Sequence, residues 1–277
     1  MMAILCTMPG RFGDILWALP TVRAISETYE LPVDLVVAHK YAAIIPLIEQ
    51  QPYIRRAWAA TDWDIQETAP MTPRIPPTLT GEVNGELVDL LDPIVGAYDR
   101  IYHLSYTGWP SQPLPFEIHL TARLQYDGEV DPLDLDRPWV HSHGAIYHVP
   151  VVSGFSDEHF ELKVGLFTLL KEQREINQII APHSRWATEL DHAGTETWIA
   201  AAALIAGAKV FLGCNSGMHV LACALGKPVV MMEPNVQRHH PIFYPFGTEG
   251  RVLLVRGLDG QPTFDARHVA EALKKFA

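Results

Sequence analysis

One segment near the C-terminus constrains the fold more than any other part of the chain. It runs from Gly213 to Met232 and reads as a strand end, a polar turn, an apolar helix, a glycine stop and a second buried strand. In the turn, Asn215 or Ser216 can cap the helix, and Gly217 lets a ligand approach the backbone closely. Free N–H groups and the helix dipole make this turn a candidate phosphate or diphosphate site, and an ordinary connection that binds nothing is the alternative.

A second turn of this kind lies near the N-terminus. Ala3 to Met8 is an apolar run that predicts a strand, and apolar residues recur at helical spacing from Ile15 to Ile25. Between them, the turn ends in Gly13 and Asp14, just outside the carboxyl end of the strand. Open α/β sheets bind ligands at this edge, so Asp14 is a candidate site residue. Its alternative role is that of the helix N-cap.

Strand and helix patterns alternate through both ends of the chain, which indicates an α/β fold with parallel sheets. The expected strands are Ala3–Met8, Val33–Ala38, Arg55–Ala59, Tyr98–Leu104, Ala145–Val149, Gln178–Ala181, Val210–Leu212, Val229–Met232 and Val252–Val255. The expected helices are Ile15–Glu27, Tyr41–Gln50, Glu86–Leu91, Glu158–Lys171, Glu196–Ala206, one after Ser216 and one from Asp265. Pro20 should kink the first helix or delay its start.

Taken together, the two turns resemble those of the heptosyltransferase-like GT-B glycosyltransferases, the ADP-heptose:LPS heptosyltransferase type of glycosyltransferase family 9. The matching residues are Gly13-Asp14, with Leu19-Pro20 and Val22-Arg23-Ala24 following, and Asn215-Ser216-Gly217, with Ala222 and Ala224-Leu225-Gly226-Lys227-Pro228 following. The resemblance covers about the first sixty residues and residues 195 to 235. It implies two Rossmann-like parallel-sheet domains that face each other across a cleft.

The acidic, turn-like segment Asp127–Arg137 is the best linker candidate. We therefore expect an N-terminal, acceptor-side domain over residues 1–135 and a C-terminal, nucleotide-sugar-binding domain over residues 136–277. Two proline-rich stretches, at 65–97 and 105–115, are expected to be irregular and to form the acceptor-side rim, with a plain surface insertion as the alternative.

The resemblance also implies a reaction. The chain would be an inverting, metal-independent glycosyltransferase that uses no cofactor. It would move a sugar from a nucleotide-sugar donor to a hydroxyl of a glycan or other acceptor, with Asp14 as the general base. The alternatives are a sugar-nucleotide epimerase or hydrolase, and a non-catalytic GT-B-like protein that binds a nucleotide or a glycan.

The second turn departs from the family pattern at two positions. Asn215 stands where the family has Asp, so a donor contact through a carboxylate is lost. His219 comes three residues after Ser216, whereas the family often has its histidine four residues after the Ser or Thr. On a helix this shift rotates the side chain by about 100°. His219 therefore either covers the ligand differently or packs beside Cys223.

Several cationic side chains are candidates for binding the departing diphosphate. They are Arg11, Lys163, Arg185 and Arg238, and His239 shares the loop of the last one. Metal sites are not expected. Asp62-Trp63-Asp64 is better explained as a solvated turn than as a metal clamp, and His141 and His143 lack a third ligand at a suitable spacing.

Composition argues against several other classes of protein. The formal net charge is −11 without a run of Lys or Arg, which argues against a nucleic-acid surface. No apolar run approaches the ~20 residues of a membrane helix, and the start lacks the basic flank of a signal peptide. The three cysteines, an odd number in apolar surroundings, indicate reduced thiols and a cytoplasmic protein. Gly-x-Ser-x-Gly and Gly-x-Gly-x-x-Gly motifs are absent.

Overall fold

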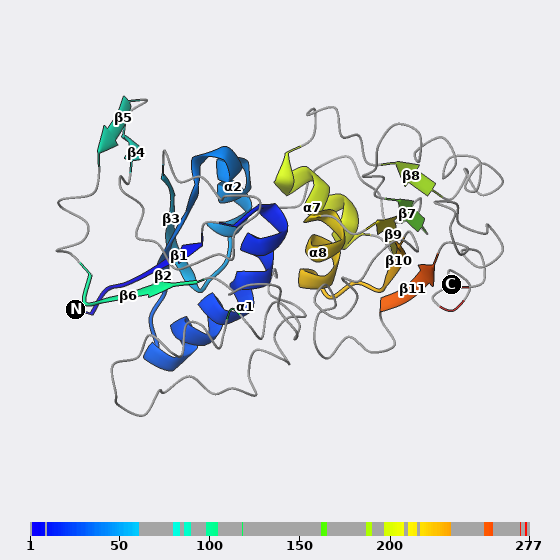
Figure 1. Cartoon of the computed structure of the whole chain (residues 1–277), viewed down its shortest axis with the longest axis horizontal. Helices are drawn as coiled ribbons and strands as arrows, with labels where there is room; N and C mark the ends of the chain where they lie inside the picture. Colours follow the sequence, from blue (N-terminus) through cyan, green and yellow to red (C-terminus); the bar gives the residue numbers. More distant parts are fainter. Residues whose placement is uncertain are drawn as a thin grey trace.

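The chain folds into two parallel β-sheets with helices between them (Figure 1). The computed structural model describes residues 2–8, 10–60, 98–104, 197–207, 210–214 and 217–233, the strands at 80–83, 86–89, 162–164, 187–189 and 252–256, and residues 118, 272 and 275. The first sheet uses strands from the N-terminal part of the chain and the second uses strands from the C-terminal part.

The first sheet has the strand order β3-β2-β1-β6, and all its described pairings are parallel. Its strands are β1 (Ile4–Met8), β2 (Val33–Ala38), β3 (Ile54–Ala60) and β6 (Arg100–His103). The helices after β1 and β2 are α1 (Phe12–Tyr29), the 3₁₀ helix η1 (His39–Ile44) and α2 (Ile45–Ile48). The chain leaves β1 toward β2 and returns on the other side at β6, so the strand order reverses between β1 and β6.

The second sheet has the order β11-β10-β9-β7-β8 and is also parallel in every pairing described. Its strands are β7 (Leu162–Val164), β8 (Ala187–Glu189), β9 (Phe211–Cys214), β10 (Val229–Glu233) and β11 (Val252–Arg256). Helix α7 (Trp198–Ala206) precedes β9 and helix α8 (Gly217–Ala224) follows it. Here the strand order reverses between β7 and β9.

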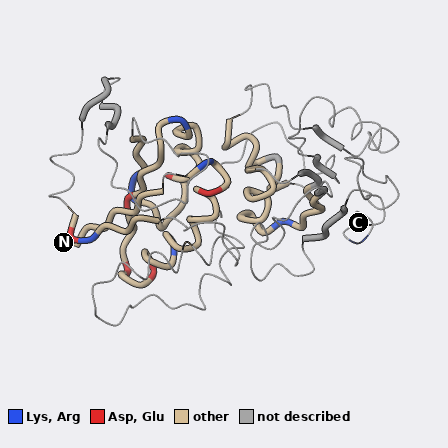
Figure 2. The backbone as a smooth tube through the Cα atoms, in the orientation of Figure 1, with Lys and Arg blue, Asp and Glu red and all other residues tan. Residues whose placement is uncertain are grey.

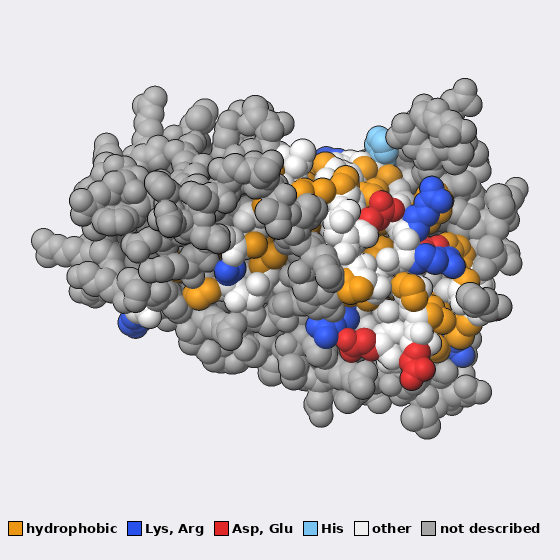
Figure 3. All heavy atoms as spheres, turned by 180° about the vertical axis from the view of Figure 1, so that it is seen from behind, with side chains coloured by type: hydrophobic (Ala, Val, Ile, Leu, Met, Phe, Trp, Pro, Cys, Tyr) orange, Lys and Arg blue, Asp and Glu red, His pale blue; other side chains and the backbone are white. Residues whose placement is uncertain are grey.

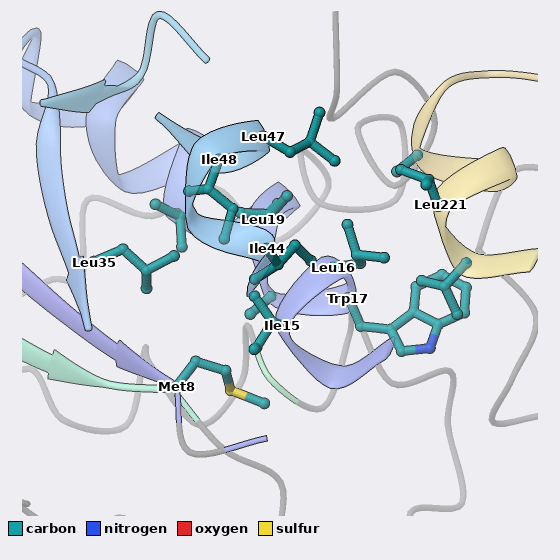
Figure 4. Close-up of a cluster of buried hydrophobic side chains, with 14 of the residues drawn as sticks. Met8, Ile15, Leu16, Trp17, Leu19, Leu35, Ile44, Leu47, Ile48 and Leu221 are labelled. Atoms are coloured by element: carbon teal, nitrogen blue, oxygen red, sulfur yellow. The ribbon is translucent and has the colours of Figure 1, made fainter. Parts of the chain in front are cut away.

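The core extends from the first sheet through the helices into the second half. The apolar positions of α1 that recur at helical spacing are all buried, namely Ile15, Leu16, Leu19, Val22 and Ile25. Figure 4 shows Ile15, Leu16 and Leu19 of this helix with Met8 of β1 and Leu35 of β2 on one side and Leu221 of α8 on the other. A single cluster of buried side chains therefore includes residues of both halves.

Most of the elements expected from the sequence are confirmed. The predicted strands at 3–8, 33–38, 55–59, 98–104, 210–212, 229–232 and 252–255 and the helices at 15–27, 196–206 and after Ser216 are present with small shifts of their ends. The helix expected at Tyr41–Gln50 is instead the 3₁₀ helix η1 followed by the short α2, where Pro46 lies in the first turn. Helix α1 starts at Phe12 and continues past Pro20, so the proline does not delay its start.

Two predicted helices are wrong. Residues 86–89 form strand β5 (Glu86–Asp89), which pairs antiparallel with β4 (Thr80–Val83) inside the stretch expected to be irregular. The ladder leaves two residues, Asn84 and Gly85, between the strands, and Asn-Gly strongly favours a two-residue hairpin. Within the expected helix Glu158–Lys171, residues 162–164 form β7, because its neighbours β8 and β9 offer pairing on both sides. Strand β8 was not expected.

Other expectations fall on residues outside the described part of the chain. They are the linker Asp127–Arg137, the strands Ala145–Val149 and Gln178–Ala181, the stretch 105–115 and the helix from Asp265. Among the helices that the structure describes, none has the length and apolar character needed to span a bilayer.

Candidate functional site

Asp14 lies in the first turn of α1, where its carboxylate is held by the backbone. Arg11 is the N-cap residue, and Asp14, three positions on, accepts a hydrogen bond through Oδ2 from the Arg11 backbone N–H at 2.9 Å. This corrects the expectation that Asp14 itself caps the helix, because it occupies the third helical position instead. Asp14 is partly exposed and Arg11 is exposed.

Gly10 makes this arrangement of Asp14 possible. A Cβ atom at position 10 would lie 2.2 Å from Cβ of Asp14 and 2.7 Å from Cε of Met8. Any side chain at this buried position would therefore displace Asp14 from its place against the Arg11 N–H. The sequence alone does not reveal this role of Gly10, because a glycine in a turn is most simply explained by the turn itself.

The second motif meets the first at the starts of α1 and α8. A Cβ atom at Gly217 would lie 3.2 Å from Cη2 of Trp198, 3.4 Å from Cβ of Phe12 and 3.6 Å from the backbone N of Gly13. A Cβ atom at Gly13 would in turn lie 3.6 Å from Cγ2 of Val220 and 3.8 Å from Cα of Gly217. The two turns that the sequence singled out thus lie side by side, with little space for a side chain between them.

The two motif turns also occupy equivalent positions, each in its own sheet. Strand β1 borders the point where the strand order of the first sheet reverses, and β9 borders the corresponding point in the second sheet. Open α/β sheets bind ligands outside the carboxyl ends of strands at such points. Both motif turns follow the carboxyl ends of these strands, so they lie where each sheet is expected to bind its ligand.

Two aromatic residues, Phe12 and Trp198, lie beside Gly217, and a third, Tyr41, packs on Phe12. The sequence alone pointed to none of them. The ring of Phe12 lies 4.6 Å from the ring of Trp198 and 5.0 Å from that of Tyr41, measured between centroids. Trp198 is the first residue of α7, whose N-cap Thr197 accepts a hydrogen bond from the Ala200 N–H at 3.2 Å. The only signal in the sequence was that Phe12 stands inside the first motif.

His219 lies in the contact between the two halves. It is fully buried, and its ring centroid lies 6.1 Å from the Trp17 ring in an edge-on arrangement. Leu16 and Trp17 extend from α1 toward Leu221 of α8 (Figure 4). This position agrees with the packing role considered for His219, while its ligand role stays a prediction.

The remaining candidates are not brought together by the described residues. Lys163 lies within β7, opposite Phe211 of β9 and Thr188 of β8, and not on a helix. The other candidates, Arg185, Asn215, Ser216, Arg238 and His239, lie outside the described residues. The cleft expected between the halves stays a prediction as well.

A polar pair lies at the reversal point of the first sheet. Thr7 of β1 and His103 of β6 are opposite each other in the ladder, and Oγ1 of Thr7 lies 2.9 Å from Nδ1 of His103. Thr7 is buried, and burial lowers the pKa of His103, so the imidazole is neutral at pH 7. Sequence reasoning missed this pair because only the strand register brings the two residues together.

Charges of both signs are mixed over the described surface. Figure 3 shows acidic and basic side chains interspersed among apolar ones on the described part of one face. The start of α1, which carries a basic and an acidic residue, lies beside the second half of the chain (Figure 2). Among the described residues, no group of three or more His, Cys, Asp or Glu side chains is placed to hold a metal ion.

Comparison with models of protein families and with curated proteins finds no match. Among solved structures, the chain is similar to E. coli ADP-heptose LPS heptosyltransferase II, with a TM-score of 0.60, 15% identity and coverage of 99% of this chain and 98% of that one. It is also similar to E. coli heptosyltransferase WaaC with ADP, with a TM-score of 0.59, 13% identity and coverage of 100% of each chain.

A family 9 glycosyltransferase from Veillonella parvula is similar as well, with a TM-score of 0.58, 11% identity and coverage of 100% of this chain and 90% of that one. These three alignments span nearly the whole of the present chain, and at such low identity they report on architecture alone. The two parallel sheets, the helices between them and these likenesses lead to one conclusion. The chain has the fold of the GT-B glycosyltransferases.

Proposed function

We propose that this protein is a glycosyltransferase that moves a sugar from a nucleotide-sugar donor to a hydroxyl group of an acceptor. The observation that carries the proposal is the contact between the two motif turns at the starts of α1 and α8, each at the reversal point of its own sheet. An acceptor bound above the first sheet and a donor bound above the second would meet there. This is the arrangement that a transfer between two bound substrates requires.

The donor side of the site would be the start of α8. Backbone N–H groups of its first turn, beginning at Gly217, would hold the diphosphate, with Asn215 and Ser216 of the preceding turn as further ligands. Arg11, which is exposed at the start of α1, is the cation of the first motif and is proposed as a ligand of the diphosphate. Lys163, Arg185, Arg238 and His239 are proposed as further ligands.

Solved structures similar to this chain support the choice of donor. WaaC has been crystallised with ADP and with ADP-2-deoxy-2-fluoro heptose, the second structure having a TM-score of 0.56 and 14% identity to this chain. An adenine nucleotide sugar is therefore the first donor to test.

We propose that the acceptor binds to the domain of residues 1–135 and the donor to the domain of residues 136–277. The first sheet ends with His103 and the second begins with Leu162, which supports a boundary between them.

Asp14 would act as the general base. Its carboxylate accepts one backbone N–H, and a carboxylate retains further lone pairs for an acceptor hydroxyl. The acceptor O–H bond breaks as its proton passes to Asp14, the oxygen forms a bond with the anomeric carbon, and the bond from that carbon to the diphosphate breaks. Attack on the face opposite the diphosphate inverts the anomeric configuration. Proton removal by a placed base typically contributes 10²–10⁴-fold, and charge stabilisation of the leaving diphosphate adds to it.

We further propose that the reaction needs no metal ion and takes place in the cytoplasm. N–H groups at a helix start and arginine side chains can neutralise a diphosphate without a cation. Cys6 and Cys223 are free and buried, as expected in a reducing compartment. Turnover that is lost in chelator and restored by Mg²⁺ or Mn²⁺ would contradict the proposal that the reaction needs no metal ion.

A melting-temperature screen over nucleoside diphosphates and their sugars tests the proposal. A ligand at 100 times its dissociation constant stabilises the folded state by about 2.7 kcal/mol, so a true donor should raise the melting temperature clearly. Nucleotide sugars that do so are then incubated with the protein, and release of the nucleoside diphosphate is followed. Stabilisation without any release or transfer would indicate a non-catalytic binding protein, and no stabilisation by any nucleotide would overturn the proposal.

A further inference from the structure

The two motif turns approach each other at Gly13 and Gly217, and two aromatic residues lie beside Gly217. The Trp198 ring and Cβ of Phe12 lie 3.2 and 3.4 Å from the place where a Gly217 side chain would begin. Phe12 comes from the first motif, but Trp198 belongs to α7 and to neither motif. We call Phe12 and Trp198 the aromatic bracket.

We propose that Phe12 and Trp198 are positioning residues that set the separation between Asp14 and the start of α8. This inference rests on the proposed function, since it concerns how the base and the donor are aligned. Phe12 is two residues before Asp14 in the same helical turn, and its ring lies 4.6 Å from that of Trp198. The Trp198 ring in turn lies 3.2 Å from the place of a Cβ atom at Gly217. A shift of either ring would therefore move one motif turn relative to the other.

The bracket is itself fixed on both sides. On the first half, Phe12 packs edge-on against Tyr41 of η1 at 5.0 Å. On the second half, Trp198 begins α7, where the Thr197 side chain caps the helix. Aromatic pairs at such distances stabilise a defined geometry beyond the burial of their area.

The buried core between α1 and α8 has a different role, which is to hold the two helices together. Leu16, Trp17, His219 and Leu221 pack between the bodies of α1 and α8, two to four residues beyond Asp14 or Gly217. The bracket lies at the helix starts themselves, where the reacting groups would lie. In an aligned reaction, misplacement by about 1 Å can cost 10²-fold in rate, so the bracket should influence turnover more than folding or donor binding.

The test compares Trp198→Ala with a matched control, Trp58→Ala. Trp58 lies in β3, where its ring packs under the Arg56 guanidinium at 3.8 Å, in a separate apolar cluster of the first half. Both variants are checked for cooperative melting. Turnover is then measured with the nucleotide sugar that stabilises the wild-type protein most, and its nucleoside diphosphate is titrated calorimetrically.

For Trp198→Ala we expect kcat per folded molecule to fall about 10- to 100-fold, with diphosphate affinity and donor KM changed less than about threefold. Trp58→Ala should keep the wild-type kcat. Trp198→Phe retains an aromatic ring at this place and should recover most of the lost rate. An unchanged kcat in folded Trp198→Ala, or equal losses in both tryptophan variants, would overturn the positioning role.

A second measurement needs no substrate. Amide hydrogen exchange should become faster in the first turns of both α1 and α8 in Trp198→Ala, while β2 keeps its wild-type protection. If Trp198→Ala does not fold, the same measurements are made on Trp198→Leu. If the wild-type protein transfers no sugar, the positioning role falls with the proposed function, and the exchange rates still report whether the bracket holds the two turns together. Unchanged exchange in both turns would show that it does not.

Discussion

Gly217 illustrates how closely two explanations of one residue can compete. As a turn glycine before a helix, it suggests a place where a phosphate approaches the backbone. In the folded chain, the direction of its missing side chain is occupied by Trp198, Phe12 and Gly13. A Cβ atom at this position would be tight against Trp198 and Phe12, so the packing of the two halves favours glycine here. The N–H groups of the same turn remain the proposed diphosphate ligands.

Gly217→Val should destabilise the protein by about 1–3 kcal/mol, because extra bulk is forced between the Trp198 ring and the Gly13 backbone. Calorimetric melting measures this loss. Valine has a higher helix propensity than glycine, so helix propensity does not account for such a loss. A Gly217→Val protein that melts like the wild type but no longer binds nucleotide would show that position 217 faces the ligand instead.

Asp14→Asn should leave the fold and donor affinity nearly unchanged, since the Asn side-chain oxygen can still accept from the Arg11 N–H. Turnover should fall by roughly 10²–10⁴ if the carboxylate is the base. A steady-state transfer assay combined with nucleotide titration separates the roles. A fall in donor affinity that matches the fall in rate would make Asp14 a binding residue.

At the scale of elements, the first sheet is tied together by a polar group at the ends of its strands opposite the candidate site. Asp34 of β2 is 2% exposed and accepts from Arg55 Nε at 2.8 Å and Nη2 at 2.6 Å. The hydroxyl of Tyr98, just before β6, donates to the same carboxylate. The Arg55 bonds join the neighbouring strands β3 and β2, whereas the Tyr98 bond joins β2 to the residues that enter β6, on the other side of β1.

The hydrogen bond from Tyr98 to Asp34 predicts that the protein loses stability at high pH. Burial, followed by the bond to Asp34, raises the pKa of Tyr98 to about 12. The folded state therefore favours the neutral phenol, so stability is fully present below the unfolded-state pKa of about 10 and is lost as pH rises through about 12. Tyr98→Phe should be less stable at pH 8, by about 1.5–3 kcal/mol for a hydrogen bond to a charged group.

Denaturant melts of both proteins between pH 8 and 11.5 check this expectation. The difference in unfolding free energy between wild type and Tyr98→Phe should narrow as the pH rises above 10, because only the wild type has a phenol at position 98 to ionise. A gap that stays constant over this range would mean that Tyr98 contributes by packing and not through its hydroxyl.

At the scale of the whole molecule, the two halves are joined through one buried cluster that runs from the first sheet through α1 and α8 to Val229 and Met231 of β10. We expect a single cooperative unfolding transition, because neither half keeps its core when the other unfolds. Scanning calorimetry should give a calorimetric enthalpy equal to the van't Hoff enthalpy. Two resolved transitions would show that the halves are energetically independent.

Local patterns in the sequence determined a large part of this fold. The apolar runs at Ile4–Met8, Val33–Ala38 and Val229–Glu233 and the helical periodicity of Phe12–Tyr29 are visible without any partner, because burial on both faces or on one helical face leaves a local signature. The turns beside these elements pointed to Asp14 and Gly217 for the same reason. Their resemblance to a family then predicted the GT-B fold that the structure has.

Only the tertiary structure decided what depends on residues distant in sequence. Leu162–Val164 became a strand because β8 and β9 pair with it, against the helix expected from its neighbours. Thr7 pairs with His103 because the strand register places them opposite each other. Asp14 packs against Gly10 because the backbone folds back on itself at this turn. The contact of Gly13 with Gly217, enclosed by Phe12 and Trp198, joins opposite ends of the chain. Local propensity and periodicity carry no information on such contacts, because their free energy arises only when both halves are folded and packed together.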